Sequence, residues 1–267
     1  MTRLIPLLAG LGLLLPAAGI AGTPALEKRL DDSIEVLTQF TQIPERGIPA
    51  RLLNNAYGVA VIPNTIKAGF MLAGRFGQGV LVVRRPDGSW SNPSFIRLAG
   101  GSFGLQAGAE STDIVLVFKT KRSVDRIAKG KLKLGADVAV AAGPWGRSTS
   151  AATDLSLKAE IFSYARSRGL FGGIALDGSV LSMDEKANAA YYQSGPGDAN
   201  IILGDATVPA PARAREFKQL LASVAPPLNW QANGSRTASV DEQPAQPART
   251  YGLDEAPAAT PEGDVIF

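Results

Sequence analysis

The residues best suited to binding chemistry are seven basic side chains within fifteen positions. They are Lys119, Lys121, Arg122, Arg126, Lys129, Lys131 and Lys133. Asp125 is the one acidic residue among them, and Val124, Ile127 and Leu132 are interspersed. Cations mixed with a few apolar residues suit an anionic membrane surface, where each cation contributes on the order of 1 kcal/mol. An ordinary solvated helix with basic flanks is the alternative.

Catalytic chemistry has much weaker support. The chain contains neither histidine nor cysteine, so the commonest general base and the thiolate nucleophile are missing. Gly100–Gly104 fits a nucleophile elbow, but no histidine is available to take the serine proton. The acidic candidates are Asp31–Asp32, Asp184–Glu185, Glu110 and Asp113. We therefore expect no catalytic residues, no metal and no cofactor, and keep a carboxylate-dependent enzyme as a distant alternative.

Charge is unevenly distributed along the chain. Residues 22–195 hold 21 Lys and Arg against 15 Asp and Glu, a net charge of +6. Residues 196–267 hold 5 against 9, a net charge of −4. The basic body favours an anionic lipid or membrane surface as partner. An envelope protein is a second possible partner, and no nucleic acid is expected.

The N-terminal residues have the pattern of a secretory signal peptide. Arg3 precedes an apolar run, Leu4–Ile20, that ends in small residues. We expect a signal peptide over residues 1–21 with cleavage after Ala21, and a periplasmic or secreted mature protein. A lipid-binding domain then spans 22–195. An extension follows over 196–224, with a possible helix at Ala212–Val224, and 225–267 is expected to be a disordered tail rich in proline and alanine.

One helix is predicted at the start of the domain and another within the basic run, and a helix at Asp184–Tyr192 is predicted to close the domain. Leu26, Leu30, Ile34, Leu37 and Phe40 fall within an arc of about 120° at the helical period. This stripe suits either packing on the protein's own core or contact with a membrane surface. A short helix is predicted at Ser123–Lys129, with Ser123 as its cap.

Between the helices, short apolar runs alternate with glycine and predict strands. The runs begin at Gly58, Ala68, Val80, Phe95, Leu105 and Ile114. A turn or bulge is predicted at Gly74–Gly79, and a hairpin at Asp177–Gly178. The short connections require antiparallel pairing. The predicted fold class is α+β, a glycine-rich antiparallel β-sandwich or partly closed barrel with flanking helices.

Four segments carry a resemblance to a known family. They are Gly58–Pro63 with Lys67–Phe70, Asp87–Ser94 with Gly104–Gly108, Leu134–Asp137 with Gly143–Arg147, and Tyr164–Gly173 with Asn188 and Tyr191. In this order they resemble the SYLF domain, also called the Ysc84-type actin-regulator or lipid-binding domain. The segments lie between Ile48 and Tyr192, more than half of the mature chain.

The resemblance implies a non-enzymatic lipid-binding module. Eukaryotic members look like phosphoinositide binders that work beside actin-assembly proteins, whereas exported bacterial members look like envelope proteins. We therefore predict binding of anionic phospholipid or fatty acid in the periplasm. On charge and spacing, Lys67 joins the seven cations as a predicted lipid-binding residue. The alternative is a structural or protein-interaction component of the cell envelope without a lipid ligand.

Overall fold

The computed structural model describes residues 23–42, 47–70, 72–103, 108–144, 158–167, 169–193, 203–204 and 208–226. All of them belong to the first of two compact units, Met1–Ala232 and Asn233–Phe267. The predicted signal peptide, the tail beyond residue 226 and residues 145–147 of the third family segment lie outside the described residues. Within the described ranges, no helix is both long and apolar enough to cross a membrane.

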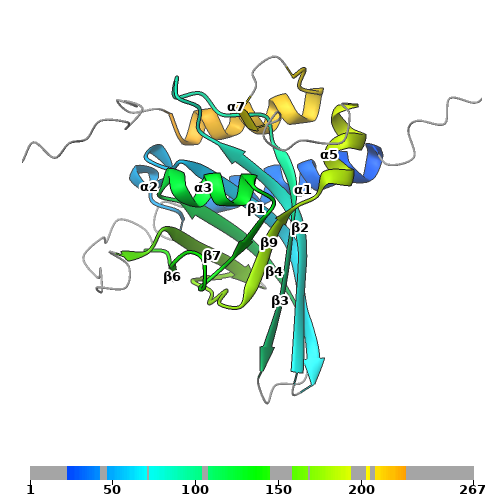
Figure 1. Ribbon diagram of the computed structural model, residues 1–267, viewed down its shortest axis with the longest axis vertical. Helices are drawn as coiled ribbons and strands as arrows, with labels where there is room; N and C mark the ends of the chain where they lie inside the picture. Colours follow the sequence, from blue (N-terminus) through cyan, green and yellow to red (C-terminus); the bar gives the residue numbers. More distant parts are fainter. Residues whose placement is uncertain are drawn as a thin grey trace, which may run out of the picture. The chain divides into compact units, whose positions relative to one another are not determined.

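Helices and strands are mixed along the chain (Figure 1). The described helices are α1 (Thr23–Gln42), α2 (Ala50–Asn54), α3 (Lys121–Ala128), α5 (Glu185–Tyr192) and α7 (Ala212–Val224). The long strands are β1 (Gly58–Phe70), β2 (Leu72–Val83), β3 (Ser94–Phe103) and β4 (Gly108–Phe118). The short strands are β5 (Lys131–Lys133), β6 (Val140–Ala142), β7 (Ile161–Ser167), β8 (Leu170–Gly172) and β9 (Ser179–Met183).

The strands form one curved nine-stranded sheet in the order β5-β9-β3-β2-β1-β4-β7-β6, with β8 paired to β7. The predicted α+β class with flanking helices is confirmed. Of the two predicted arrangements, a sandwich and a partly closed barrel, the single curled sheet corresponds to the partly closed barrel. Pairing is antiparallel except between β6 and β7, which are parallel.

Both faces of the sheet are buried, which explains why the strands are almost continuously apolar. Along β1, Val59 and Val61 belong to one core cluster, whereas Ala60 and Ile62 belong to the other. Successive residues of a strand point to opposite faces, so each face receives every second side chain. α1 and α7 cover the first face, and α3 packs on the second.

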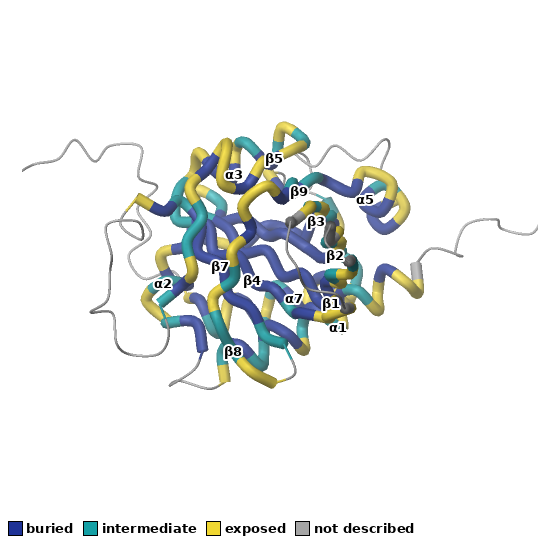
Figure 2. The backbone as a smooth tube through the Cα atoms, turned by 90° about the horizontal axis from the view of Figure 1, so that it is seen from below, coloured by how far each residue is buried: buried dark blue, intermediate teal, exposed yellow. Residues whose placement is uncertain are grey.

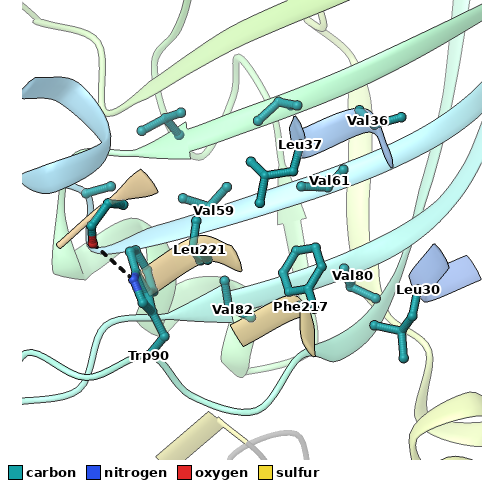
Figure 3. Packing of buried hydrophobic residues seen from close by; sticks show 14 of the residues in the cluster. Leu30, Val36, Leu37, Val59, Val61, Val80, Val82, Trp90, Phe217 and Leu221 are labelled. Atoms are coloured by element: carbon teal, nitrogen blue, oxygen red, sulfur yellow. Dashed lines mark hydrogen bonds between the residues drawn. The ribbon is translucent and has the colours of Figure 1, made fainter. Parts of the chain in front are cut away.

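The apolar stripe of α1 packs inward. Leu30 and Leu37 are fully buried against the sheet, together with Phe217 and Leu221 of α7 (Figure 3). Phe40 is fully buried in the same cluster. The stripe is thus part of the core, and the alternative of a membrane-surface helix is wrong. The helix predicted at Ala212–Val224 contributes to the same core, and truncating a buried phenylalanine such as Phe217 costs about 3–5 kcal/mol.

Four strand segments project beyond the helices (Figure 1). We call them the arm: Ile66–Phe70, Leu72–Phe76, Ala99–Phe103 and Gly108–Ser111. β7 pairs with β4 only from Asp113 onward, and β9 pairs with β3 only up to Gly100, so the outer arm strands lose their neighbours. The arm therefore presents both of its faces beyond the main core.

A bulge in β1 marks the base of the arm. The pairing register shifts between Ile62 and Thr65, and Asn64 has φ 48°. The Asn64 N–H donates to the Asp113 carboxylate at 3.0 Å, and that carboxylate pairs with Arg166 at 2.6 Å. A bulge bends its strand and increases the local twist. Asp113 thus holds the point at which the arm departs from the body.

The turn predicted at Gly74–Gly79 and the hairpin predicted at Asp177–Gly178 are wrong. The glycine-rich segment Gly74–Gly79 lies inside β2, and the chain reverses between Phe70 and Leu72. A Cβ on Gly79 would collide with the carbonyl oxygen of Val61, so this glycine lets β2 approach the bulged β1. Asp177–Gly178 does form a turn, with Gly178 at φ 77°, but β9 pairs with β3 and β5, so no hairpin with β8 results.

Candidate functional site

The basic run lies on α3 and β5, and two side chains anchor the helix start. The Thr120 hydroxyl caps α3 by accepting from the Ser123 N–H at 3.3 Å. Glu160 accepts from the hydroxyls of Thr120 and Ser123 at 3.0 and 2.9 Å. The helix begins at Lys121, two residues before the predicted start, because Thr120 rather than Ser123 has the extended backbone of a cap.

The apolar residues between the cations are core residues. Val124 of α3 is buried, and Ile127 and Leu132 are fully buried in the second core cluster. The sequence suggested that they contact a membrane together with the cations, and this part of the prediction is wrong. Their burial has a different effect, because it fixes α3 and β5 with their charged sides outward.

Five of the seven cations form an exposed surface, which we call the basic face: Lys121, Arg122, Lys129, Lys131 and Lys133. In β5, exposed Lys131 and Lys133 flank the buried Leu132, so the two lysines share one side of the strand. Lys121 pairs with exposed Asp125 at 2.8 Å. The other four carry no ion pair to another described residue.

The remaining two cations of the run have structural contacts. The ammonium of Lys119 lies 4.7 Å from the centre of the Phe162 ring, a cation–π contact. Arg126 donates to the main-chain oxygen of Asp137, whose carboxylate accepts from the Lys133 N–H at 2.7 Å. Both side chains are half-buried. Arg126 joins α3 to the loop after β5, Lys119 packs on β7, and both contribute little to the exposed charge.

Lys67 lies apart from the basic face. α3 and β5 lie on one side of the molecule, whereas β8 lies on the opposite side (Figure 2). Lys67 lines a cavity of about 340 Å³ between the arm and the β7–β8 turn. We call this cavity the arm pocket. The structure therefore divides the eight predicted lipid-binding residues between two regions.

The arm pocket has a row of charges across three strands. Lys67 is the register partner of Arg75 on β2 and of Glu110 on β4, so two cations accompany one carboxylate. The Arg75 guanidinium donates to the main-chain oxygen of Ala175 at 3.1 Å. Burial lowers the pKa of Arg75, and the nearby charge of Glu110 partly offsets this effect.

The rim and wall of the arm pocket differ in polarity. The wall includes the hydroxyl side chains of Thr65, Thr112 and Ser167. Leu170 of β8 lies at the rim and is 76% exposed, the largest exposure among the large apolar residues whose burial is described. A polar, cationic wall beside an exposed leucine suits an amphiphilic anion.

The other face of the arm also carries exposed apolar side chains. Ile66 and Phe76 are register partners and line a groove of about 310 Å³ beside the first turns of α1. The cations of this groove are already paired. Lys28 binds Asp32 at 2.8 Å, and Arg29 donates to Gln78 at 2.8 Å and to Asp184 at 3.3 Å. This face has fewer free charges than the arm pocket.

The acidic residues considered for catalysis have structural contacts. Asp184 is buried, caps α5 by accepting from the Ala187 N–H at 3.2 Å, and pairs with Arg97 at 2.6 Å. Asp31 pairs with Arg213 at 3.1 Å. Within the described ranges, no group of three or more acidic residues is placed to hold a metal ion.

Comparison with known proteins decides the family. A family model described as Ysc84, Las17-binding protein actin regulator, matches residues 99–224. SH3 domain-containing YSC84-like protein 1 from Rattus norvegicus is 38% identical over 204 residues, which cover 74% of this chain and 59% of the relative. Its namesake from Pongo abelii is 34% identical over 253 residues, 89% of this chain and 73% of the relative. This chain belongs to the Ysc84 family.

The resemblance inferred from the four segments is thereby confirmed. A further Ysc84 relative is LAS seventeen-binding protein 3 from Saccharomyces cerevisiae, 40% identical over 179 residues, 65% of this chain and 38% of the relative. The chain spans 59% of the length of the rat and mouse relatives. Expected bacterial origin and export remain predictions.

The Ysc84 match also bears on the C-terminal segment of the domain. It begins at Ala99 in β3 and ends at Val224, the last residue of α7. The match therefore contains the basic face, and α7 lies within it. Although the sequence placed α7 in an extension, the packing of Phe217 and Leu221 makes the helix part of the core.

Sequence reasoning missed Arg75 and Leu170 of the arm pocket. Arg75 stood inside the supposed turn at Gly74–Gly79, and Leu170 was not considered as a binding residue. A usable signal was present in the spacing. Lys67 and Arg75 are each four residues from Met71, so a hairpin turn placed at Met71 would have paired them.

Proposed function

We propose that this Ysc84-family protein is a non-enzymatic protein that binds anionic membrane surfaces through its basic face. The observation that carries the proposal is the presence of five exposed cations on α3, its C-cap Lys129 and β5, with one ion pair, Lys121–Asp125, among the described residues. Underneath, Val124, Ile127 and Leu132 are buried, so the charges stand on a rigid base.

The expected energy is sufficient for reversible binding. Cations near an anionic bilayer contribute about 1 kcal/mol each. Arg122, Lys129, Lys131 and Lys133 have no ion pair within the described part of the chain, so together they contribute on the order of 4 kcal/mol at most. No apolar insertion is needed from α1, whose stripe packs in the core.

Sedimentation with phosphatidylglycerol vesicles tests the proposal. The variant Arg122→Gln, Lys129→Gln, Lys131→Gln, Lys133→Gln should bind on the order of a hundredfold more weakly at 0.1 M salt. All four side chains are exposed, so folding should be little affected. Unchanged vesicle binding would contradict the proposal.

A matched control separates the basic face from net charge. Lys28, Lys186, Arg213 and Arg215 are exposed cations of α1, α5 and α7. Changing these four to glutamine alters the net charge by the same amount and should leave most of the vesicle binding intact. Equal loss in both variants would point to a general charge effect.

We also propose that the protein acts outside the cytoplasm, in the periplasm or cell envelope. The support is the run of one basic residue, an apolar segment and small residues over 1–21. N-terminal sequencing of the envelope fraction should find a mature N-terminus near Gly22. An intact Met1 there would contradict this part.

A second candidate function is binding to a protein partner. The family description names Las17 binding and actin regulation, and the yeast relative is named LAS seventeen-binding protein 3. This chain covers only 38% of that relative, so the named binding can belong to the remainder. If vesicles are not bound at low salt, the protein-interaction hypothesis becomes the better one.

A further inference from the structure

The arm pocket has features that the proposed surface binding does not require. It is concave, whereas the basic face is a row of side chains on a helix and a strand. It is also lined by residues of β1, β2, β4, β7 and β8, and β8 lies on the side of the molecule away from α3 (Figure 2). The proposed binding through the basic face therefore does not account for the arm pocket.

The charges of the pocket suit a single negative charge. Lys67 and Arg75 oppose one carboxylate, Glu110, across adjacent strands, so the row has an excess of one positive charge. Lys67 makes no hydrogen bond or ion pair to another described residue. The Arg75 guanidinium has five N–H donors, and its one hydrogen bond within the described part of the chain goes to Ala175.

The surroundings of these cations favour an oxygen anion. A half-buried guanidinium is costly without a partner, and a fork of N–H donors matches the oxygens of carboxylates and phosphates. Thr65, Thr112 and Ser167 place three hydroxyl groups in the same wall, and each donates a long hydrogen bond of 3.4 Å to a protein oxygen. The cavity volume of about 340 Å³ is at the lower end of the range for small-ligand sites, about 300–1,000 Å³.

We infer that the arm pocket binds a singly charged oxyanion head group whose acyl chain lies on Leu170. Lys67 and Arg75 contact the head group, and the exposed leucine at the rim covers part of the chain. The inference rests on the proposed function in taking a lipid as ligand, but it concerns a separate set of residues. A fatty acid carboxylate and a phospholipid phosphodiester share the required chemistry.

Calorimetry with the full chain and soluble ten-carbon probes tests the inference. Decanoate and decanoyl lysophosphatidylglycerol should bind at one site, and whichever binds more tightly identifies the source of the head group. Decanol, which lacks the charge, should bind at least about tenfold more weakly. Equal affinity for decanol, or no binding of either anion, would overturn the inference.

Three variants identify the residues. Lys67→Gln should weaken the tighter anion about tenfold without lowering the melting temperature, because Lys67 makes no hydrogen bond or ion pair to another described residue that could be lost. Arg75→Gln should weaken it similarly. Glu110→Gln should strengthen it about threefold, because a neighbouring negative charge is removed. Unchanged affinity in Lys67→Gln, or weaker binding in Glu110→Gln, would overturn the assignment.

The two proposals can fail separately. The basic-face variant Arg122→Gln, Lys129→Gln, Lys131→Gln, Lys133→Gln should lose vesicle binding and keep the parent affinity for decanoate. Lys67→Gln should do the reverse. Joint loss of decanoate and vesicle binding in the basic-face variant would overturn the inference of a separate pocket.

Discussion

The basic face and the arm pocket both use lysine and arginine, but in opposite surroundings. On the basic face, four of the five cations have no ion-pair partner among the described residues and stand on buried apolar side chains. In the arm pocket, two half-buried cations share a cavity with one carboxylate, three hydroxyl side chains and an exposed leucine. The basic face has the higher density of exposed charge, whereas the arm pocket is a cavity with both polar and apolar walls.

This difference indicates two kinds of recognition. A convex row of exposed charges attracts any anionic surface and is screened by salt. A concave site with mixed polarity selects a ligand by its size, charge and apolar part. The density of cations in the sequence therefore locates the basic face, which we expect to be the less selective region. The arm pocket cannot be located in this way, because its residues come together only through the pairing of strands.

Replacing Asp113 should have the largest effect, because it should destabilise the arm and leave the basic face intact. Its carboxylate accepts from the Asn64 N–H and pairs with Arg166 at the base of the arm. Asp113→Ala should lower the free energy of unfolding by about 2 kcal/mol, a factor of about 30 in the folding equilibrium. The melting temperature should fall by about 4–8 °C in calorimetry, and decanoate affinity should fall with it.

A matched acidic residue on the basic face provides the control. Asp125→Ala removes an exposed carboxylate from α3 and should change stability by no more than about 0.5 kcal/mol. Vesicle binding by Asp113→Ala should remain close to that of the parent at 10 °C, where both proteins are folded. Equal melting temperatures for the two variants would show that the arm is not held by Asp113.

Much of the fold was predictable because local patterns determined it. The period of the apolar stripe predicted α1, and the range predicted for the last helix is that of α7. The apolar runs predicted strands, since residues such as Val59 and Ile62 are buried whichever face they take. The same patterns left open whether the stripe met a membrane or the core, and that outcome depended on packing between distant segments.

The pairing of the arm was not predictable from local patterns. Glycine usually marks a turn, but Gly79 sits opposite a bulge on a neighbouring strand, where a side chain would collide with Val61. The misplaced turn hid the pairing of Lys67 with Arg75. In addition, Ile127 and Leu170 are both apolar residues near cations, yet one is fully buried and the other 76% exposed. Only the tertiary structure distinguishes them.

Raising the salt concentration should have the next largest effect, and it should weaken binding at the basic face more than binding at the arm pocket. Raising the salt concentration from 0.1 to 0.5 M shortens the Debye length from about 10 Å to about 4 Å. Vesicle binding through the exposed basic face should weaken about tenfold, whereas decanoate binding should weaken by less than about threefold, because half-buried pairs are screened less. Co-sedimentation and calorimetry in the same buffers give both numbers. A larger loss of affinity for decanoate than for vesicles would contradict the assignment of exposed charge binding to the basic face and half-buried binding to the arm pocket.

Replacing Leu170 should affect ligand binding in the arm pocket alone. Leu170→Ser should weaken decanoate binding about fivefold, because part of the acyl chain loses its apolar contact, and should leave vesicle binding unchanged. Ile66→Thr is the matched control, since Ile66 is 54% exposed on the other face of the arm. Isothermal titration should show parent affinity for this control. A similar loss in both variants would mean that the arm is perturbed as a whole.

The smallest expected effect concerns the acidic residue of the basic face. Asp125 pairs with Lys121 at 2.8 Å, and both side chains are well exposed. The pair contributes little to stability, because an exposed i,i+4 pair is worth about 0.3–0.5 kcal/mol. Asp125→Asn removes one negative charge from the face and frees Lys121, so phosphatidylglycerol vesicles should bind about threefold more tightly at 0.1 M salt. The gain should disappear at 0.5 M salt, and decanoate affinity should not change. Weaker vesicle binding in Asp125→Asn would show that α3 is not the element facing the membrane, because a more positive surface cannot bind an anionic bilayer less well through the same residues.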